Sequence, residues 1–155
     1  MQSNIIASHF KNVVSDFAIL SELHELRQLA DNIEDYSPRE LQDDFLSISL
    51  RKGIYDQIRL IEADGQEILR IDYNNGKPLL TPKNQLQNKV DRYYFKETMV
   101  LARNEVYVSP LDLNIEKGKI EKPFKPMIRF GMPILNRKDE KRGALILNFL
   151  AKSII

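Results

Sequence analysis

The sequence predicts a single α+β domain, in which a long N-terminal helix and flanking helices pack on an antiparallel sheet of about five strands. Its 155 residues are the usual length of one domain. Helical spacing dominates the first fifty residues, whereas strand-like segments joined by short turns fill most of the remainder. Because these segments do not alternate regularly with helices, antiparallel pairing is favoured over a parallel β-α-β arrangement.

A long amphipathic helix is predicted from about residue 4 to residue 35. Its apolar side chains recur at alternating steps of four and three: Ile6, Phe10, Val13, Phe17 and Leu20. A helix of about thirty residues exceeds the usual globular length, so it could be a stalk, the seam of a homodimer or a helix packed along the whole domain. We assign residues 1–36 to this helix and residues 37–155 to the core, and the spacing leaves the three roles open.

A second helix is predicted to begin at Ser37-Pro38 and to end at Gly53. Serine caps helices, proline fits the first helical position, and Glu40 stands where a capping box needs a glutamate. Asp64-Gly65 and Asn75-Gly76 are typical of tight hairpin turns between strands. The remaining predicted elements are a helix over residues 83–101 and strands over residues 105–109, 127–135 and 143–149.

The composition excludes several classes of function. A net charge of +1 provides no field for a nucleic-acid partner, and the absence of cysteine excludes disulfides and thiolate chemistry. His9 and His24 lie fifteen positions apart on the first predicted helix, about 22 Å along its axis, and cannot share a metal ion. The six glycines are dispersed rather than gathered in a phosphate-binding loop. We therefore expect no catalytic residues, no metal site and no cofactor, and the domain is not expected to be an enzyme.

Polar side chains inside apolar segments are the candidate binding residues. Arg129 interrupts Met127–Phe130, and Asn148 interrupts Leu145–Phe149. In a half-buried strand such a residue faces either solvent or a pocket. Arg129 could therefore be exposed, form a structural ion pair or contact a ligand, and Asn148 could be a hydrogen-bonded core amide or a ligand contact. Asp91–Phe95 is predicted to end an amphipathic helix beside the sheet, where its arginine and second tyrosine reach one pocket only at the helix end.

The chain resembles the Cache (PDC, PAS-like) sensor domains of bacterial receptors, and is similar to the membrane-distal half of double-Cache sensors of histidine kinases and diguanylate cyclases. The resemblance extends over nearly the whole chain and includes the long leading helix and the Asp64-Gly65 hairpin. It rests on the order and spacing of Asp91-Arg92-Tyr93-Tyr94-Phe95, Val106-Tyr107-Val108-Ser109-Pro110, Lys125–Ile134 and Gly143–Asn148.

The resemblance implies a PAS-like sheet on which a helix and a long loop enclose a pocket for a small molecule. Arg92, Tyr94 and Phe95 correspond to family positions that hold a ligand carboxylate. The positions that hold an amine in the family correspond to Leu111 and Asn148, and a neutral amide lacks the charge that an ammonium prefers, which argues against an amino-acid ligand. The expected ligand-binding residues are Arg92, Tyr94, Tyr107, Ser109, Arg129 and Asn148.

The resemblance also implies an extracytoplasmic, periplasmic domain that binds a small anionic ligand and passes a conformational change to the membrane. No stretch reaches the roughly 18–20 apolar residues of a membrane span, and no signal peptide is recognisable, so the membrane segments would belong to a longer, membrane-anchored parent. The alternative is a docking module for a periplasmic binding protein, without a pocket of its own. Residues 110–126, with Lys117, Lys119 and Lys122, would then form the contact surface.

Overall fold

The computed structural model describes residues 2–32, 36–113, 115–116, 119–120 and 126–151. Its helices are α1 (Gln2–Ser21), α2 (His24–Asp31), α3 (Pro38–Lys52) and α4 (Tyr93–Met99), with a short 3-10 helix η1 (Lys83–Gln85). Its strands are β1 (Tyr55–Glu62), β2 (Glu67–Asn74), β3 (Lys77–Leu80), β4 (Tyr107–Val108), β5 (Asp112–Leu113), β6 (Ile115–Glu116), β7 (Lys119–Ile120), β8 (Pro126–Leu135) and β9 (Lys141–Leu150).

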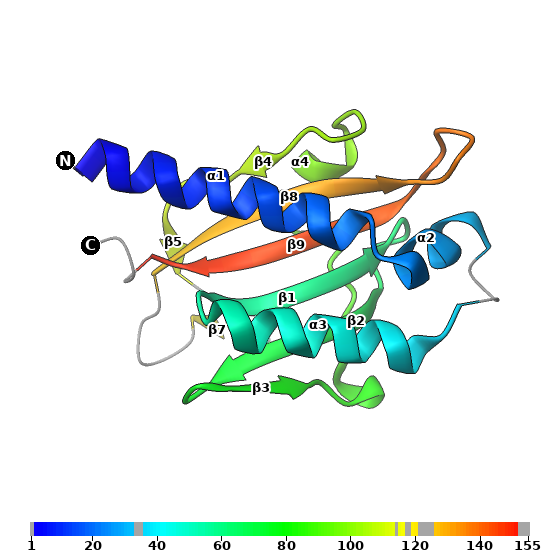
Figure 1. Ribbon diagram of the computed structural model, residues 1–155, viewed down its shortest axis with the longest axis horizontal. Coiled ribbons are helices and arrows are strands. Elements are labelled where there is room, and N and C mark those ends of the chain that lie inside the picture. The colour runs from blue at the N-terminus through cyan, green and yellow to red at the C-terminus, as the bar shows by residue number, and fades with distance from the viewer. Residues whose placement is uncertain (1, 33–35, 114, 117–118, 121–125, 152–155) are drawn as a thin grey trace.

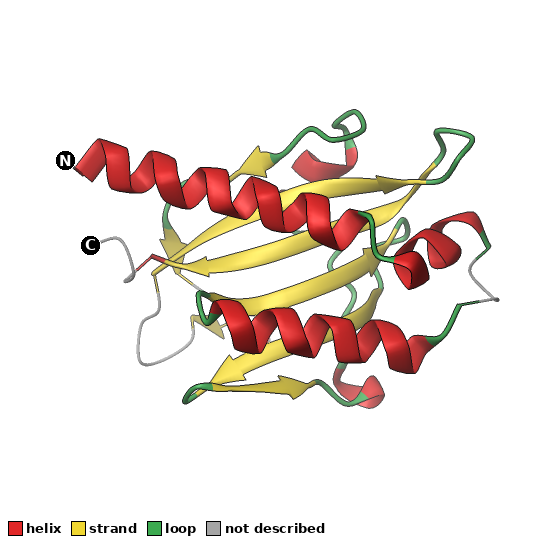
Figure 2. Cartoon of the chain, in the orientation of Figure 1, coloured by secondary structure: helices red, strands yellow, loops and turns green. Residues whose placement is uncertain are grey.

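Seven strands form one antiparallel sheet in the order β3-β2-β1-β9-β8-β4, with β5 also paired to β8. The short strands β6 and β7 pair with each other in a separate hairpin. Helices α1 and α3 cover one face of this sheet, and α4 lies on the other (Figures 1 and 2). The predicted α+β class is confirmed. The sheet exceeds the expected five strands because β4 and β5 add short pairings to β8.

Side-chain alternation along the strands separates the core into two layers. Leu145, Leu147 and Phe149 of β9 pack with the helices α1 and α3, in the larger cluster. Ala144 and Ile146 face the opposite way, toward α4. The same alternation places Arg59 of β1 and Arg129 of β8 on the α4 face. They lie beside the smaller apolar cluster, whose buried members are Ile61, Tyr94, Phe95, Ala144 and Ile146.

Local sequence signals set the ends of α3 and of the first hairpins as predicted. Ser37 Oγ accepts a hydrogen bond from the Glu40 backbone N–H, and Pro38 is the first helical residue. The capping box differs in one contact, because the Ser37 N–H donates to Glu25 Oε2 of α2 instead of to Glu40. Gly53 ends the helix at φ 62°, in the left-handed region. The turns at Asp64-Gly65 and Asn75-Gly76 join β1 to β2 and β2 to β3.

The prediction of one continuous helix from residue 4 to residue 35 is wrong at residues 22–23. α1 ends at Ser21, and Leu23 adopts an extended conformation (φ −58°, ψ 132°) before α2 begins. Phe17, Leu20, Leu23 and Leu26 follow one another in steps of three, and each such step falls about 60° short of a full turn. A straight helix would rotate Leu26 away from the sheet, whereas the break lets α2 turn and bury it. The division at residue 36 stays a prediction.

The predicted helix over residues 83–101 is also wrong for most of its length. Only η1 and α4 are helical, and Arg92 begins α4 as its N-cap instead of ending a helix. The backbone between them pairs with the β1–β2 hairpin: the Lys89 N–H donates to the Gly65 carbonyl, and the Glu67 N–H donates to the Gln87 carbonyl. Long-range backbone pairing therefore replaces the helix that the local spacing favours. No helix in the described parts of the chain is long and apolar enough to cross a membrane.

Candidate functional site

Gly131 allows α4 to pack directly on the sheet. A Cβ at this position of β8 would lie 1.9 Å from Thr98 Oγ1 and 3.0 Å from Ile146 Cδ1, so no larger residue fits without movement. The Thr98 hydroxyl in turn donates to the Tyr94 carbonyl within α4. This close approach brings Tyr94 onto the polar side chains of β1, β8 and β9.

Three guanidinium groups surround the buried ring of Tyr94. The Cζ atoms of Arg59, Arg129 and Arg92 lie 4.6, 5.3 and 5.4 Å from the ring centroid, within the range of cation–π contact. These arginines come from β1, from β8 and from the N-cap of α4, so three elements contribute to one site. We call Tyr94 with its three arginines the guanidinium cluster.

Arg59 lies at the bottom of the guanidinium cluster and is 2% exposed. Its Nη1 donates to the Tyr94 hydroxyl at 2.6 Å, and its Nη2 donates to Asn148 Oδ1 at 2.7 Å. Glu67 Oε2 lies 3.8 Å from Nη1. Arg59 Nε has no hydrogen-bond acceptor among the described residues. This buried cation thus has one N–H group without an acceptor among the described residues.

Arg129 forms the outer side of the cluster with two residues from neighbouring segments. It is 1% exposed, and its Nη1 lies 3.3 Å from both Asp112 Oδ2 and the Tyr93 hydroxyl. The Tyr93 hydroxyl also donates to Asp112 Oδ2 at 2.8 Å. The Arg129 backbone N–H donates to Ser109 Oγ, which ties the segment after β4 to β8.

A second polar network continues from Arg59 across β2. Glu67 Oε1 accepts from the Gln87 N–H at 2.9 Å and lies 3.5 Å from Arg70 Nη1. Asp72 Oδ2 accepts from Arg70 Nε at 3.2 Å and from the Thr81 hydroxyl at 2.6 Å. The carboxylates on this side of the site are therefore already bonded to the protein's own donors.

The surrounding charges change the acidity of the tyrosines. Burial alone would raise the pKa of Tyr94, but the positive charges of Arg59, Lys89 and Arg129 outweigh burial and lower it. Burial raises the pKa of Tyr93 and of Tyr107, so both remain neutral donors at physiological pH. The site thus has a strongly positive character around Tyr94.

The structure brings four of the six predicted binding residues together. Arg92, Tyr94 and Arg129 belong to the guanidinium cluster, and the fully buried Asn148 contacts Arg59. The ring of Tyr107 packs at the edge of the small apolar cluster beneath α4. The hydroxyl of Ser109 donates to the Pro110 carbonyl and accepts from β8, so it serves the backbone. Their contact with a ligand stays a prediction.

Sequence reasoning missed Arg59, Tyr93 and Asp112. Arg59 interrupts Ile58-Arg59-Leu60 just as Arg129 interrupts its own apolar strand, so the same signal was present.

Of the lysines assigned to the alternative docking surface, Lys117 and Lys122 lie outside the described residues, and Lys119 is exposed in β7.

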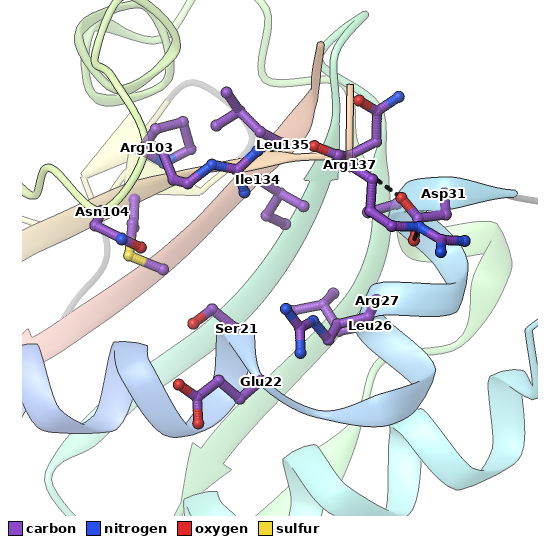
Figure 3. Close-up of a pocket in the computed structure, with 14 residues that line it drawn as sticks. Ser21, Glu22, Leu26, Arg27, Asp31, Arg103, Asn104, Ile134, Leu135 and Arg137 are labelled. Carbon is purple, nitrogen blue, oxygen red and sulfur yellow. Dashed lines mark hydrogen bonds and ion pairs between the residues drawn. The ribbon is translucent and has the colours of Figure 1, made fainter. Parts of the chain in front are cut away.

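A different pocket, of about 230 Å³, is lined by the α1–α2 junction, by α2, by Arg103 and Asn104, and by the end of β8 with the turn that follows it (Figure 3). Asp31 accepts from the Arg137 N–H at 2.9 Å and pairs with its guanidinium. Arg103 bonds to Asp139 and to the Asn136 carbonyl across the pocket. None of the six predicted binding residues lines it, and its contacts fasten α2 to the β8–β9 turn.

Comparisons with solved structures show the same fold in several receptor domains. The extracellular domain assigned to a histidine kinase, vpHK1S-Z8, is 21% identical with a TM-score of 0.82, over 99% of this chain and 56% of that one. A domain assigned to a sensory box/GGDEF family protein of Vibrio parahaemolyticus is 24% identical with a TM-score of 0.79, over 96% and 57%. The ligand-binding domain of the Campylobacter jejuni chemoreceptor Tlp3, in complex with L-norvaline, is 12% identical with a TM-score of 0.65, over 99% and 55%.

These neighbours are Cache/PDC-type sensor domains, as the sequence resemblance predicted. The chain spans a little over half the length of each of them. No curated protein matches the sequence. A family model described as "Bacterial histidine kinase, sensor domain" matches residues 6–154, which is nearly the entire chain. The chain therefore belongs to the family of bacterial histidine kinase sensor domains.

Proposed function

We propose that this domain binds a small anionic organic ligand, such as a carboxylate, on the α4 face of its sheet. The observation that carries the proposal is the convergence of three guanidinium groups on the buried ring of Tyr94. Burying cations is costly unless a partner compensates them. A bound anion would supply such a partner, and a guanidinium offers a rigid bidentate fork for a carboxylate.

Within this site, Arg92 is the primary anchor because it is the least buried of the three arginines. It is half-buried, and its described contacts are with the rings of Tyr93 and Tyr94 instead of with a carboxylate. Arg129 and Arg59 approach the same ring from the sheet, and Tyr107 borders the apolar side. A ligand would thus meet cations on one side and aromatic rings on the other.

Binding would be passed to the rest of the receptor through the ends of the domain. The start of α1 and the end of β9 lie at the same end of the molecule (Figure 1), and His9 contacts Phe149 there at 5.4 Å between ring centroids. In the proposed receptor this end leads toward the membrane, and α1 is available as a dimer seam. A ligand moves this end only if it favours one arrangement energetically.

Relatives of this fold support a small-molecule role more than a docking role. Tlp3 was solved with L-norvaline and PctC of Pseudomonas aeruginosa with GABA, and both are chemoreceptor domains. We extend to this chain an extracytoplasmic location in a membrane-anchored parent, and no catalytic activity of its own. Docking to a periplasmic binding protein remains the alternative, in which Arg92 would have no role.

Replacing Arg92 tests the proposed function directly. Arg92→Ala should weaken binding of a hit carboxylate by about 2–4 kcal/mol, since the ligand's charge loses its main partner. The domain should remain folded, because Arg92 lies at a helix end and is only half-buried. Titration calorimetry on the purified domain measures the affinity.

Lys96→Ala is the matched control for this experiment, because Lys96 is an exposed cation on the same helix. It should leave the affinity unchanged. Equal binding by the wild type and Arg92→Ala would contradict the proposal and would favour the docking alternative.

A further inference from the structure

We infer that the ligand carries no ammonium group: the site selects amine-free carboxylates and rejects amino acids. This inference deepens the proposed function and rests on it. It is carried by the three guanidinium groups around Tyr94 and by the hydrogen bonds around Arg59, which occupy the acceptors that an ammonium would need.

The acceptor nearest the cluster is Asn148 Oδ1, and the protein itself uses it. Asn148 Oδ1 accepts from Arg59 Nη2 at 2.7 Å, and Asn148 Nδ2 donates to Gln57 Oε1 at 3.1 Å. Both amide oxygens of this pair therefore accept from groups within the site. An ammonium that bound to Asn148 Oδ1 would have to displace the guanidinium of Arg59 from it.

The carboxylates of the site are engaged in the same way. Asp112 Oδ2 accepts from Tyr93 and pairs with Arg129. Asp72 bonds through Oδ1 to Gln57 and through Oδ2 to Arg70 and Thr81. Glu67 Oε2 has no hydrogen-bond donor among the described residues, but it lies 3.8 Å from Arg59 Nη1, so an ammonium could reach it only by displacing that arginine.

Electrostatic repulsion also disfavours an ammonium group at this site, in addition to the occupied hydrogen-bond acceptors. An ammonium beside Tyr94 would lie near the guanidinium groups that already surround the ring. Like charges at such separations repel strongly where water is excluded. A carboxylate at the same place is attracted by these groups.

Matched pairs of acids test the selectivity. Calorimetry compares propionate with alanine, succinate with aspartate, and glutarate with glutamate. In each pair the second compound differs from the first only in that an ammonium group replaces one hydrogen. We expect at least one amine-free acid to bind, and its amino-acid counterpart to bind about 100-fold or more weakly. An amino acid that binds as tightly as its partner overturns this inference and leaves the proposed function standing. If neither series binds, the proposed function fails and the inference fails with it.

Two variants connect the selectivity to Arg59. Arg59→Met keeps an unbranched side chain, removes the guanidinium and frees Asn148 Oδ1, so the acid-to-amino-acid affinity ratio should fall at least tenfold. Arg59→Lys keeps the charge and should retain most of the ratio. An unchanged ratio in a folded Arg59→Met protein, judged by circular dichroism, would overturn the role of Arg59.

The nearly isosteric Asn148→Asp variant covers the case in which Arg59→Met does not fold. Its new carboxylate would lie within the 2.7 Å contact to Arg59 and be neutralised there, so amino-acid binding should not appear. A tenfold or greater gain in amino-acid affinity in Asn148→Asp would show that Arg59 does not occupy the ammonium position.

Discussion

At the scale of single residues, Arg59 and Arg129 show what strand alternation can and cannot predict. Each interrupts an apolar strand, and the period of two places such a residue on the face opposite its apolar neighbours. The period does not say whether that face is open to solvent or covered. Only the packing of α4 on Gly131 makes both arginines buried, and this contact joins residues more than thirty positions apart.

The sequence left two roles open for Asn148, a hydrogen-bonded core amide or a ligand contact, and the structure confirms the first. It is a fully buried amide that bonds to Arg59 and Gln57, as a core amide would. Its environment nevertheless belongs to the guanidinium cluster. The core-amide interpretation is therefore confirmed, whereas a contact between Asn148 and a ligand stays a prediction.

Tyr94→Phe should destabilise the domain by about 1–3 kcal/mol, because it leaves the Nη1 donor of buried Arg59 without its 2.6 Å acceptor. Urea denaturation followed by circular dichroism measures the change. Tyr107→Phe is the control. Tyr107 packs against the same apolar cluster beneath α4 as Tyr94, but its hydroxyl has no hydrogen bond among the described contacts. An equal effect of the two substitutions would mean that the Arg59–Tyr94 bond contributes nothing to stability.

At the scale of elements, the sequence correctly predicted the helix and hairpins whose ends are determined by a few adjacent residues. The capped start and left-handed end of α3 and both early hairpins follow from a few adjacent residues. Residues 86–92 follow a different rule, since their backbone pairs with residues around Gly65, more than twenty positions earlier. Helical spacing there is a local preference that tertiary pairing overrides.

Gly131→Ala tests the close packing of α4 that creates the site. The added methyl would overlap Thr98 Oγ1, so α4 must move outward, and the free energy of unfolding should fall by about 1–3 kcal/mol. Ligand affinity should fall as well, because Tyr94 moves with α4.

Adding Thr98→Ala to Gly131→Ala removes the nearest overlapping atom and should recover part of the loss. The pair would then be non-additive in a double-mutant cycle measured by urea denaturation. Full additivity would show that the contact between Gly131 and Thr98 does not determine the position of α4.

At the scale of the whole molecule, β1 connects the candidate site to α1. Arg59 lies within β1, and Tyr55 at its start donates to Asp16 Oδ2 of α1 at 2.5 Å. Asp16 is 1% exposed and also pairs with Lys52 at the end of α3, at 2.9 Å. Burial and the neighbouring Asp16 carboxylate raise the pKa of Tyr55, which keeps its hydroxyl protonated and able to donate. This polar contact fixes α1 lengthwise, whereas the apolar contacts around it are less directional.

Tyr55→Phe should therefore loosen α1 selectively. It removes one of the two partners of the buried Asp16 carboxylate and should cost about 1–3 kcal/mol, since bonds to charged groups are among the stronger ones. If α1 opens as a local unit, amide hydrogen exchange around Val13–Leu20 should accelerate roughly tenfold, at about 1.4 kcal/mol per tenfold change. Mass spectrometry of the exchanged protein measures this rate segment by segment.

The internal reference for this experiment is the β8–β9 pair, whose ladder does not involve Tyr55 and should exchange at an unchanged rate. Tyr107→Phe serves as the matched control, because it removes a hydroxyl on the α4 face of the sheet, opposite α1. Uniform acceleration across α1, β8 and β9 would mean that Tyr55→Phe lowers global stability and that β1 does not hold α1 separately. Arg59 of the proposed binding site and Tyr55, which contacts α1, both belong to β1. Selective loosening would therefore identify β1 as the physical link between the proposed site and α1.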